Sequence, residues 1–159
     1  MKIVELKRRN HASDFPKSDE VYGQFNRFIN ELNSWNFPDD TVSAVNGEIE
    51  ELNATATTGI RLKVLIQKKL TKISKVIETK HKVVPVNYYR NVWINRGMTL
   101  FGIPLSIVMG AIGMHFGYIA LFVVGMPLGM FAGFALGTTK DKNALREGRQ
   151  LNVNLKQNL

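Results

Sequence analysis

The sequence predicts an all-α membrane protein, with a cytoplasmic helical hairpin or three-helix unit followed by a two-span transmembrane helical hairpin. Three observations predict this fold class. Residues 97–138 are almost wholly apolar, whereas the flanking parts of the 159-residue chain are polar and charged. Apolar residues upstream recur at the spacing of a helix face. Glycines recur every four residues in the apolar part, where they let two membrane helices approach closely, although glycine weakens a helix in water by roughly 1 kcal/mol.

Residues 1–17 carry a net charge of +3 and are punctuated by Asn10, Ser13, Asp14 and Pro16. Residues of these types favour turns and loops over regular structure. We therefore expect a flexible basic arm. It has no apolar core of signal-peptide length, so we expect it to stay on the side of synthesis.

A first helix is predicted over residues 18–36. Ser18 is a good N-cap, and acidic residues in the next turn suit the positive end of the helix dipole. The helix should end before Pro38, because the residue preceding a proline avoids the helical region. Its apolar residues form a heptad-like stripe: Val21, Phe25, Phe28, Leu32 and Trp35.

Two apolar runs, 42–56 and 66–77, share one seven-residue register. Conserved phase favours a single long or kinked helix over about residues 40–80. The other interpretation is two helices with a bend at Thr57-Thr58-Gly59. In both cases residues 18–82 form a coiled-coil-like unit whose core is small for its length.

Charge is strongly segregated within this unit. Residues 18–58 carry a net charge of −7, and residues 61–82 carry +7. The basic block can face the acidic helices, anionic lipid headgroups or nucleic acid. Nucleic acid is disfavoured, because interleaved aromatic residues and a recognition fold are missing. The candidate headgroup residues on the helix are Lys68, Lys69, Lys72 and Lys75.

Residues 83–96 are predicted to lie at the membrane interface. Pro85 breaks the preceding helix, and aromatic and basic residues follow directly before the apolar run, as in an interfacial belt. Basic residues also follow the second apolar run. The candidate interface residues are Tyr88, Tyr89, Arg90, Trp93, Arg96, Lys140 and Lys142.

The spans are predicted at residues 97–114 and 118–138, which are 18 and 21 residues long. As helices they measure about 27 and 31 Å, against a hydrocarbon thickness of about 30 Å. The three residues between them force the spans to be adjacent and antiparallel. Lysine and arginine flank both outer ends and are missing from the turn, so the positive-inside rule places both termini in the cytoplasm, and we expect the bacterial inner membrane. A shallow re-entrant hairpin, which Pro104 and Pro127 would suit, is the competing geometry.

Small residues recur at similar spacing on both spans. They allow close helix packing, as in a glycine zipper. Three uses are open: packing within the hairpin with or without contacts between copies, the lining of a pore, or a surface for another membrane protein. The candidate packing residues are Gly102, Ser106 and Gly110 on the first span and Gly125, Gly129, Gly133 and Gly137 on the second.

The residues that usually carry chemistry are sparse. Without cysteine there is no disulfide, thiolate ligand or cysteine nucleophile. His11, His81 and His115 lie in separate segments without metal-ligand spacing, and no nucleotide-binding loop occurs. Residues 97–138 hold no carboxylate, lysine or arginine, which argues against a proton relay or transporter. We expect no enzyme activity, cofactor or metal.

These features predict a small integral membrane protein that acts as a non-enzymatic, self-associating scaffold or accessory subunit of a membrane complex. The alternative is an oligomeric pore-forming or membrane-permeabilising effector. The expected partners are anionic lipid headgroups and either further copies of the chain or another subunit. Residues 139–159 form a cytoplasmic tail, in which Gly148 should end the helix. Alternation over residues 151–155 suits a short edge strand or a frayed end.

Overall fold

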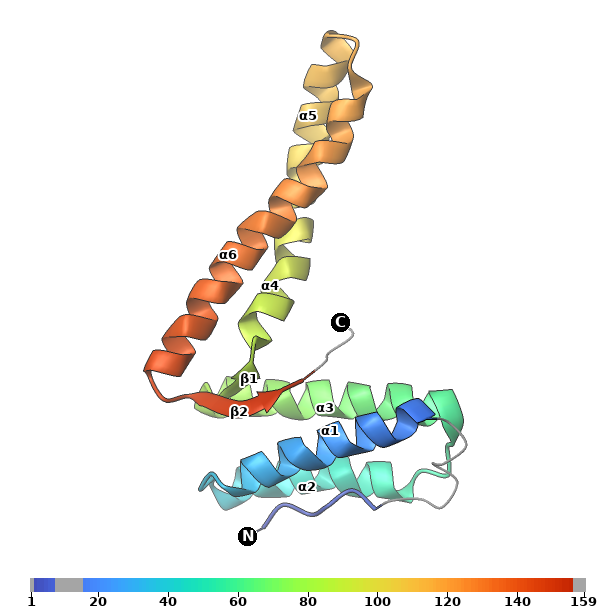
Figure 1. Cartoon of the computed structure of the whole chain (residues 1–159), viewed down its shortest axis with the longest axis vertical. Coiled ribbons are helices and arrows are strands. Elements are labelled where there is room, and N and C mark those ends of the chain that lie inside the picture. The colour runs from blue at the N-terminus through green and yellow to red at the C-terminus, as the bar shows by residue number, and fades with distance from the viewer. Residues whose placement is uncertain (1, 8–15, 156–159) are drawn as a thin grey trace. The chain divides into compact units, whose positions relative to one another are not determined.

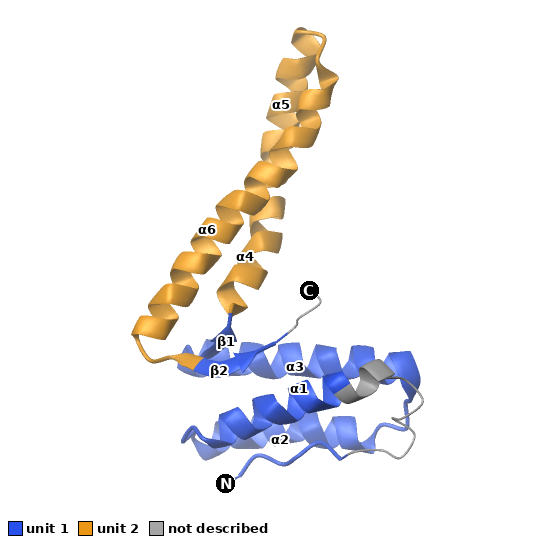
Figure 2. Ribbon diagram, in the orientation of Figure 1, with its two compact units in different colours: residues 1–86, 151–158 blue, residues 87–150, 159 orange. Residues whose placement is uncertain are grey.

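The computed structural model describes residues 2–7 and 16–155, without the side chains of residues 16–19. The chain forms two compact units, shown in different colours in Figure 2. Unit 1 comprises residues 1–86 and 151–158, and unit 2 comprises residues 87–150. The chain therefore leaves unit 1, forms unit 2 and returns to unit 1.

Unit 1 contains three helices, α1 (Pro16–Asn33), α2 (Asp39–Ala54) and α3 (Gly59–His81) (Figure 1). Helix α1 begins and ends slightly earlier than predicted, and a proline suits its first turn because the N–H there needs no partner. The predicted cap at Ser18 lies outside the described side chains. The helices share one apolar core, in which the largest fully buried side chains include Phe25, Phe28, Ile29, Leu32, Ile49, Leu52, Ile66, Ile73 and Ile77.

The single long helix favoured for residues 40–80 is not what forms. Thr55 is extended, with φ −71° and ψ 131°, and α3 starts at Gly59 with φ +62°. Glycine adopts this left-handed conformation without steric penalty, so the chain can turn there. The shared register persists because α2 and α3 each direct an apolar stripe into the same core.

Residues 2–7 form neither helix nor strand, but they are packed on unit 1 rather than free. Ile3 and Leu6 belong to the buried core. The backbone of the segment is hydrogen-bonded by the side chains of Asn33, Asn46 and Asn53. The expected flexible arm therefore does not apply to these six residues, while Met1 and residues 8–15 lie outside the described part of the chain.

A two-stranded sheet adds to the predicted all-α fold. Its strands are β1 (Val84–Val86) and β2 (Gln150–Asn154). Leu151 of β2 is fully buried in the core, and the Asn152 N–H donates to Glu31 Oε1 at 2.8 Å. The alternating tail thus finds its strand partner within the same chain, on the other side of unit 2 in the sequence.

Unit 2 is a hairpin of two helical arms, each 28 residues long. The first arm joins α4 (Tyr88–Gly97), the π-helical turn η2 (Met98–Gly102) and α5 (Ile103–His115). The second joins the 3₁₀ segment η3 (Ile119–Val124) and α6 (Gly125–Arg146). Both arms extend beyond the predicted apolar spans at their polar ends.

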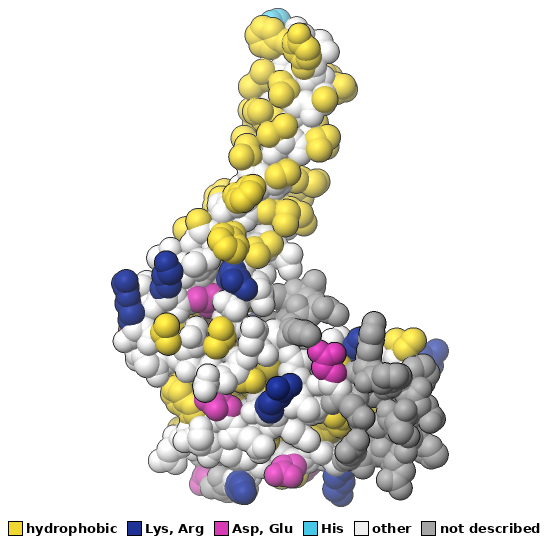
Figure 3. Space-filling model, in the orientation of Figure 1, with side chains coloured by type: hydrophobic (Ala, Val, Ile, Leu, Met, Phe, Trp, Pro, Cys, Tyr) yellow, Lys and Arg dark blue, Asp and Glu magenta, His cyan; other side chains and the backbone are white. Residues whose placement is uncertain are grey.

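The two arms are long and apolar enough to cross a membrane, which confirms the prediction at that level. Only 28% and 17% of their most apolar windows are buried. Large side chains such as Phe131 and Val123 are 72% and 69% exposed. Figure 3 shows hydrophobic side chains over α5 and the adjoining part of α6. Unit 2 therefore presents its apolar side chains outward.

Candidate functional site

The interface between the two arms of unit 2 brings the predicted packing residues together. The glycines of α6 face the backbone of the first arm, and a Cβ atom added to any of the four would come within 3.0 Å of backbone atoms. The arms are therefore in direct backbone contact along this stripe. The facing pairs are Gly125 with Ser106, Gly129 with Gly102, Gly133 with Trp93 and Gly97, and Gly137 with Arg90.

The small residues predicted on the first arm contact the second arm, and Gly97, which was not predicted, joins them. A Cβ atom on Gly102 would lie 3.1 Å from Met126 Cα, and one on Gly110 would lie 3.1 Å from the Phe122 ring. Gly97 also packs on the glycines of α6. It was missed because it lies five residues before Gly102, outside the four-residue spacing.

The π-helical turn explains why a spacing of five still places two glycines on one face. The N–H of Ile103 donates to the carbonyl of Met98, five residues earlier, which widens the helix by one residue. Pro104 follows, and its missing N–H and its ring disfavour a regular α-helical turn at this position. Pro127 lies in the first turn of α6, where no N–H partner is required. Both prolines thus fit within continuous arms.

Asp141 joins the arms at their polar ends. Its buried carboxylate accepts the N–H of Tyr89 at 3.0 Å and the N–H of Arg90 at 2.9 Å. These amides belong to the first turn of α4, where the N–H groups have no partner inside the helix. A residue of α6 therefore caps α4. The available sequence signal was a carboxylate three residues after the apolar run that ends at Thr138.

The predicted interface residues cluster around this cap. Lys140 Nζ lies 5.2 Å from the ring centroid of Trp93 and 5.7 Å from that of Tyr89, and the Arg90 guanidinium lies 5.8 Å from that of Phe134. Cations at such distances are attracted to the ring faces. The Tyr88 ring packs edge-on against Tyr89, whereas Arg96 and Lys142 are exposed. Cations and amphipathic rings therefore share one end of unit 2.

The opposite end of the hairpin carries no charged side chain. Gly117 turns the chain with φ +78°. His115 packs edge-on against Phe116, and both are exposed. The turn is thus apolar and aromatic, in contrast to the basic end.

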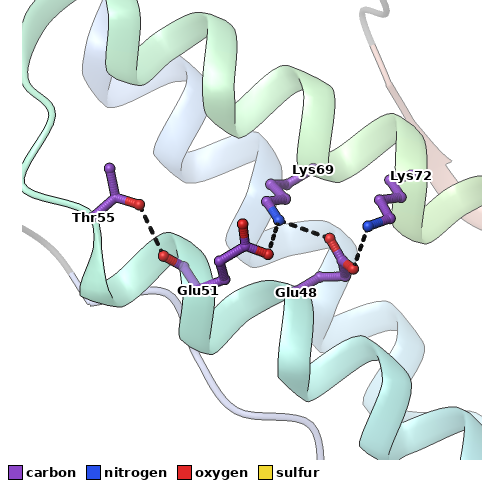
Figure 4. Close-up of polar contacts among 5 residues, drawn as sticks. All are labelled: Glu48, Glu51, Thr55, Lys69 and Lys72. Atoms are coloured by element: carbon purple, nitrogen blue, oxygen red, sulfur yellow. Dashed lines mark hydrogen bonds and ion pairs between the residues drawn. The ribbon is translucent and has the colours of Figure 1, made fainter.

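In unit 1 the four lysines predicted to contact headgroups have different environments, and Figure 4 shows two of them, Lys69 and Lys72. Lys69 is buried and pairs with Glu48 at 2.8 Å and with Glu51. Lys72 pairs with Glu48 at 2.6 Å. Lys69 is therefore wrong as a headgroup residue, because its ammonium group is enclosed between α2 and α3. Lys68 and Lys75 remain exposed.

The pairing alters the ionisation of both partners. Burial opposes the charged form of Glu48, but hydrogen bonds from two ammonium groups outweigh it and hold the pKa of Glu48 below its usual 4.5. Burial likewise opposes the charged form of Lys69, and its two carboxylate partners raise the pKa of Lys69 above 10.5. Both groups are therefore charged at neutral pH and tie α2 to α3. Lys69 and Lys72 of the basic block therefore face the acidic helix α2, which is one of the alternatives considered for that block.

Within residues 2–7 and 16–155, no cluster of three or more histidine, cysteine, aspartate or glutamate side chains could hold a metal ion. Comparisons with protein-family models, with curated proteins and with solved structures found no significant match. A function can therefore be proposed only from the geometry of the two units.

Proposed function

We propose that this protein is an integral membrane protein that acts as a non-enzymatic scaffold or accessory subunit of a membrane complex, with unit 2 as a two-span anchor. The proposal rests on the distribution of side chains in unit 2, in which glycine lies between the two arms and large apolar side chains lie on the outer surface. In water, burial of apolar surface would favour the opposite arrangement. In lipid, outward apolar side chains are already solvated, and small residues promote helix contact.

The charge distribution supports one orientation. Lys140 and Arg90 lie at the polar end of the hairpin, and the turn carries no lysine or arginine. By the positive-inside rule this end faces the cytoplasm, in our proposal that of a bacterial inner membrane. Unit 1 lies on the same side, because the chain leaves it and returns to it on either side of the hairpin. The basic residues at this end would contact anionic headgroups.

The scaffold role includes association with further copies of the chain or with another subunit. The glycines of α6 contact the first arm, so they are occupied within one hairpin. Association would then use unit 1 or the lipid-facing side chains. The pore alternative would direct the glycine stripe between hairpins, whereas the glycines of α6 contact the first arm of their own hairpin.

Cysteine labelling tests the anchor directly, because the chain has no native cysteine. We expect Phe116→Cys to react with an impermeant maleimide added to intact bacterial spheroplasts. Glu147→Cys should react only after permeabilisation. The wild-type protein should stay with membranes at alkaline pH and should exceed the mass of one chain in mild detergent. Alkaline release would overturn the anchor, and a monomer without a partner would overturn the scaffold role.

A further inference from the structure

A groove of about 290 Å³ lies on the surface of unit 2 between α4 and α6. Every described residue that lines it is apolar, and the lining residues of α6 are exposed. The groove therefore opens on the same apolar surface that unit 2 presents outward. We call it the α4–α6 groove, and its lining residues are Ile94, Pro127, Met130, Phe131 and Phe134.

The α4–α6 groove is elongated along the hairpin. Its residues on α6 recur at intervals of three or four positions, so they share one face of the helix. Pro127 and Phe134 are seven residues apart, which is about 10.5 Å of helix. Each leaflet contributes about half of a hydrocarbon core that is about 30 Å thick. The groove therefore has the length of an extended acyl-chain segment within one leaflet.

A cation lies at the polar end of the groove. The guanidinium of Arg90 is 5.8 Å from the ring centroid of Phe134, and Arg90 is one helical turn from Ile94. In the described part of the chain it forms no ion pair, although the buried carboxylate of Asp141 attracts it. The backbone of Arg90 packs against Gly137, one residue before the end of the apolar run. The guanidinium is therefore placed at the level of the headgroups, where it can bind a phosphate through two parallel hydrogen bonds.

We propose that the α4–α6 groove binds one anionic phospholipid, with an acyl chain along α6 and the phosphate on Arg90. The inference rests on the membrane anchor in the proposed function, because only an inserted hairpin exposes the groove to acyl chains. Charge complementarity favours this occupant: a phospholipid joins an apolar chain at hydrocarbon depth to an anion at headgroup level. The site is thus distinct from a general attraction between the basic end of unit 2 and the membrane surface.

The test is native mass spectrometry of the full-length protein in mild detergent, with equal amounts of phosphatidylglycerol and phosphatidylethanolamine that carry the same acyl chains. We expect one phosphatidylglycerol per chain to be retained in preference, because the ammonium group of phosphatidylethanolamine would be repelled by Arg90. Arg90→Gln should lower phosphatidylglycerol retention about ten-fold, as expected for the loss of charge-assisted hydrogen bonds. Lys140→Gln is the matched control, because Lys140 lies at the same end but over the Trp93 ring, outside the groove. Its retention should equal that of wild type.

A second pair of variants tests the acyl chain. Met130→Trp should fill the groove and abolish retention of both lipids. Leu128→Trp should leave retention unchanged, because Leu128 has a similar exposed fraction, 46% against 41% for Met130, but does not line the groove.

Three results would overturn the lipid site: equal retention of the two lipids by wild type, equal losses in Arg90→Gln and Lys140→Gln, or full retention by Met130→Trp. Wild-type protein that stays with membranes at alkaline pH but retains no lipid would also overturn the site, and it would leave the anchor intact. Release from membranes at alkaline pH would instead overturn the anchor on which the site depends.

Discussion

The closest backbone contact in unit 2 gives a direct test of how the arms are held together. A methyl group at Gly133 would fall on the carbonyl oxygen of Trp93 and lie 3.0 Å from Gly97 Cα. Ordinary contacts of a Cβ atom begin at 3.4 Å. Both neighbours are helix backbone, which cannot rotate away as a side chain can. Gly133→Ala must therefore push the arms apart.

The expected loss follows from two effects. Overfilling a packed interface costs about 1–3 kcal/mol. Separation also weakens the neighbouring contacts, because a gap of about 0.5–1 Å removes a quarter to a half of the dispersion attraction of each. We expect Gly133→Ala to lower the free energy of unfolding of the hairpin by about 2–3 kcal/mol. The measurement is an SDS titration of full-length protein in mild detergent, followed by Trp93 fluorescence in a Trp35→Phe background.

Gly110→Ala is the matched control on the same interface. Its methyl group would lie 3.1 Å from the ring of Phe122, which is a side chain and can turn aside. The expected loss is below about 1 kcal/mol. Equal losses for the two variants would refute the reasoning, since they would show that backbone contact at Gly133 has no special weight.

Four further predictions concern single residues. Asp141→Ala should speed hydrogen exchange of the Arg90 amide and cost about 1 kcal/mol as a lost helix cap, and unchanged exchange would contradict the capping role. Lys69→Met should cost about 1–3 kcal/mol in urea unfolding read by Trp35 fluorescence in a Trp93→Phe background, since the half-buried carboxylate of Glu48 loses a charged donor. The stability that the pairing adds to wild type should be complete between pH 4.5 and 10.5, and it should be lost as the pH drops through the lowered pKa of Glu48 or rises through the raised pKa of Lys69. The loss of stability at these two pH limits should be smaller in Lys69→Met. A wild-type pH profile that matches that of the variant would contradict the pairing. Gly47→Ala should stabilise unit 1 by up to about 1 kcal/mol, because the added methyl group meets no atom within 4 Å, and any destabilisation would contradict this.

Periodic features were predictable from the sequence, because their signal is local. The apolar stripe of α1 and the two apolar arms follow from spacing and run length. The break between α2 and α3 was not predictable, because a connecting loop of suitable length leaves two helices that share a core in the same seven-residue register. Gly97 was not predicted, because it lies outside the four-residue spacing. A π-helical turn, which periodicity does not reveal, places it on the face toward α6.

Contacts between side chains and distant backbone leave no periodic trace. Asn46 bonds backbone groups 42 and 44 residues away, and Asp141 bonds amides 51 and 52 residues away. Neither Asn46 nor Asp141 belongs to a recognisable sequence motif, so only the folded chain shows the partners of each. The same holds for Lys69, whose position in a basic block suggested lipid contact before its two carboxylate partners were visible.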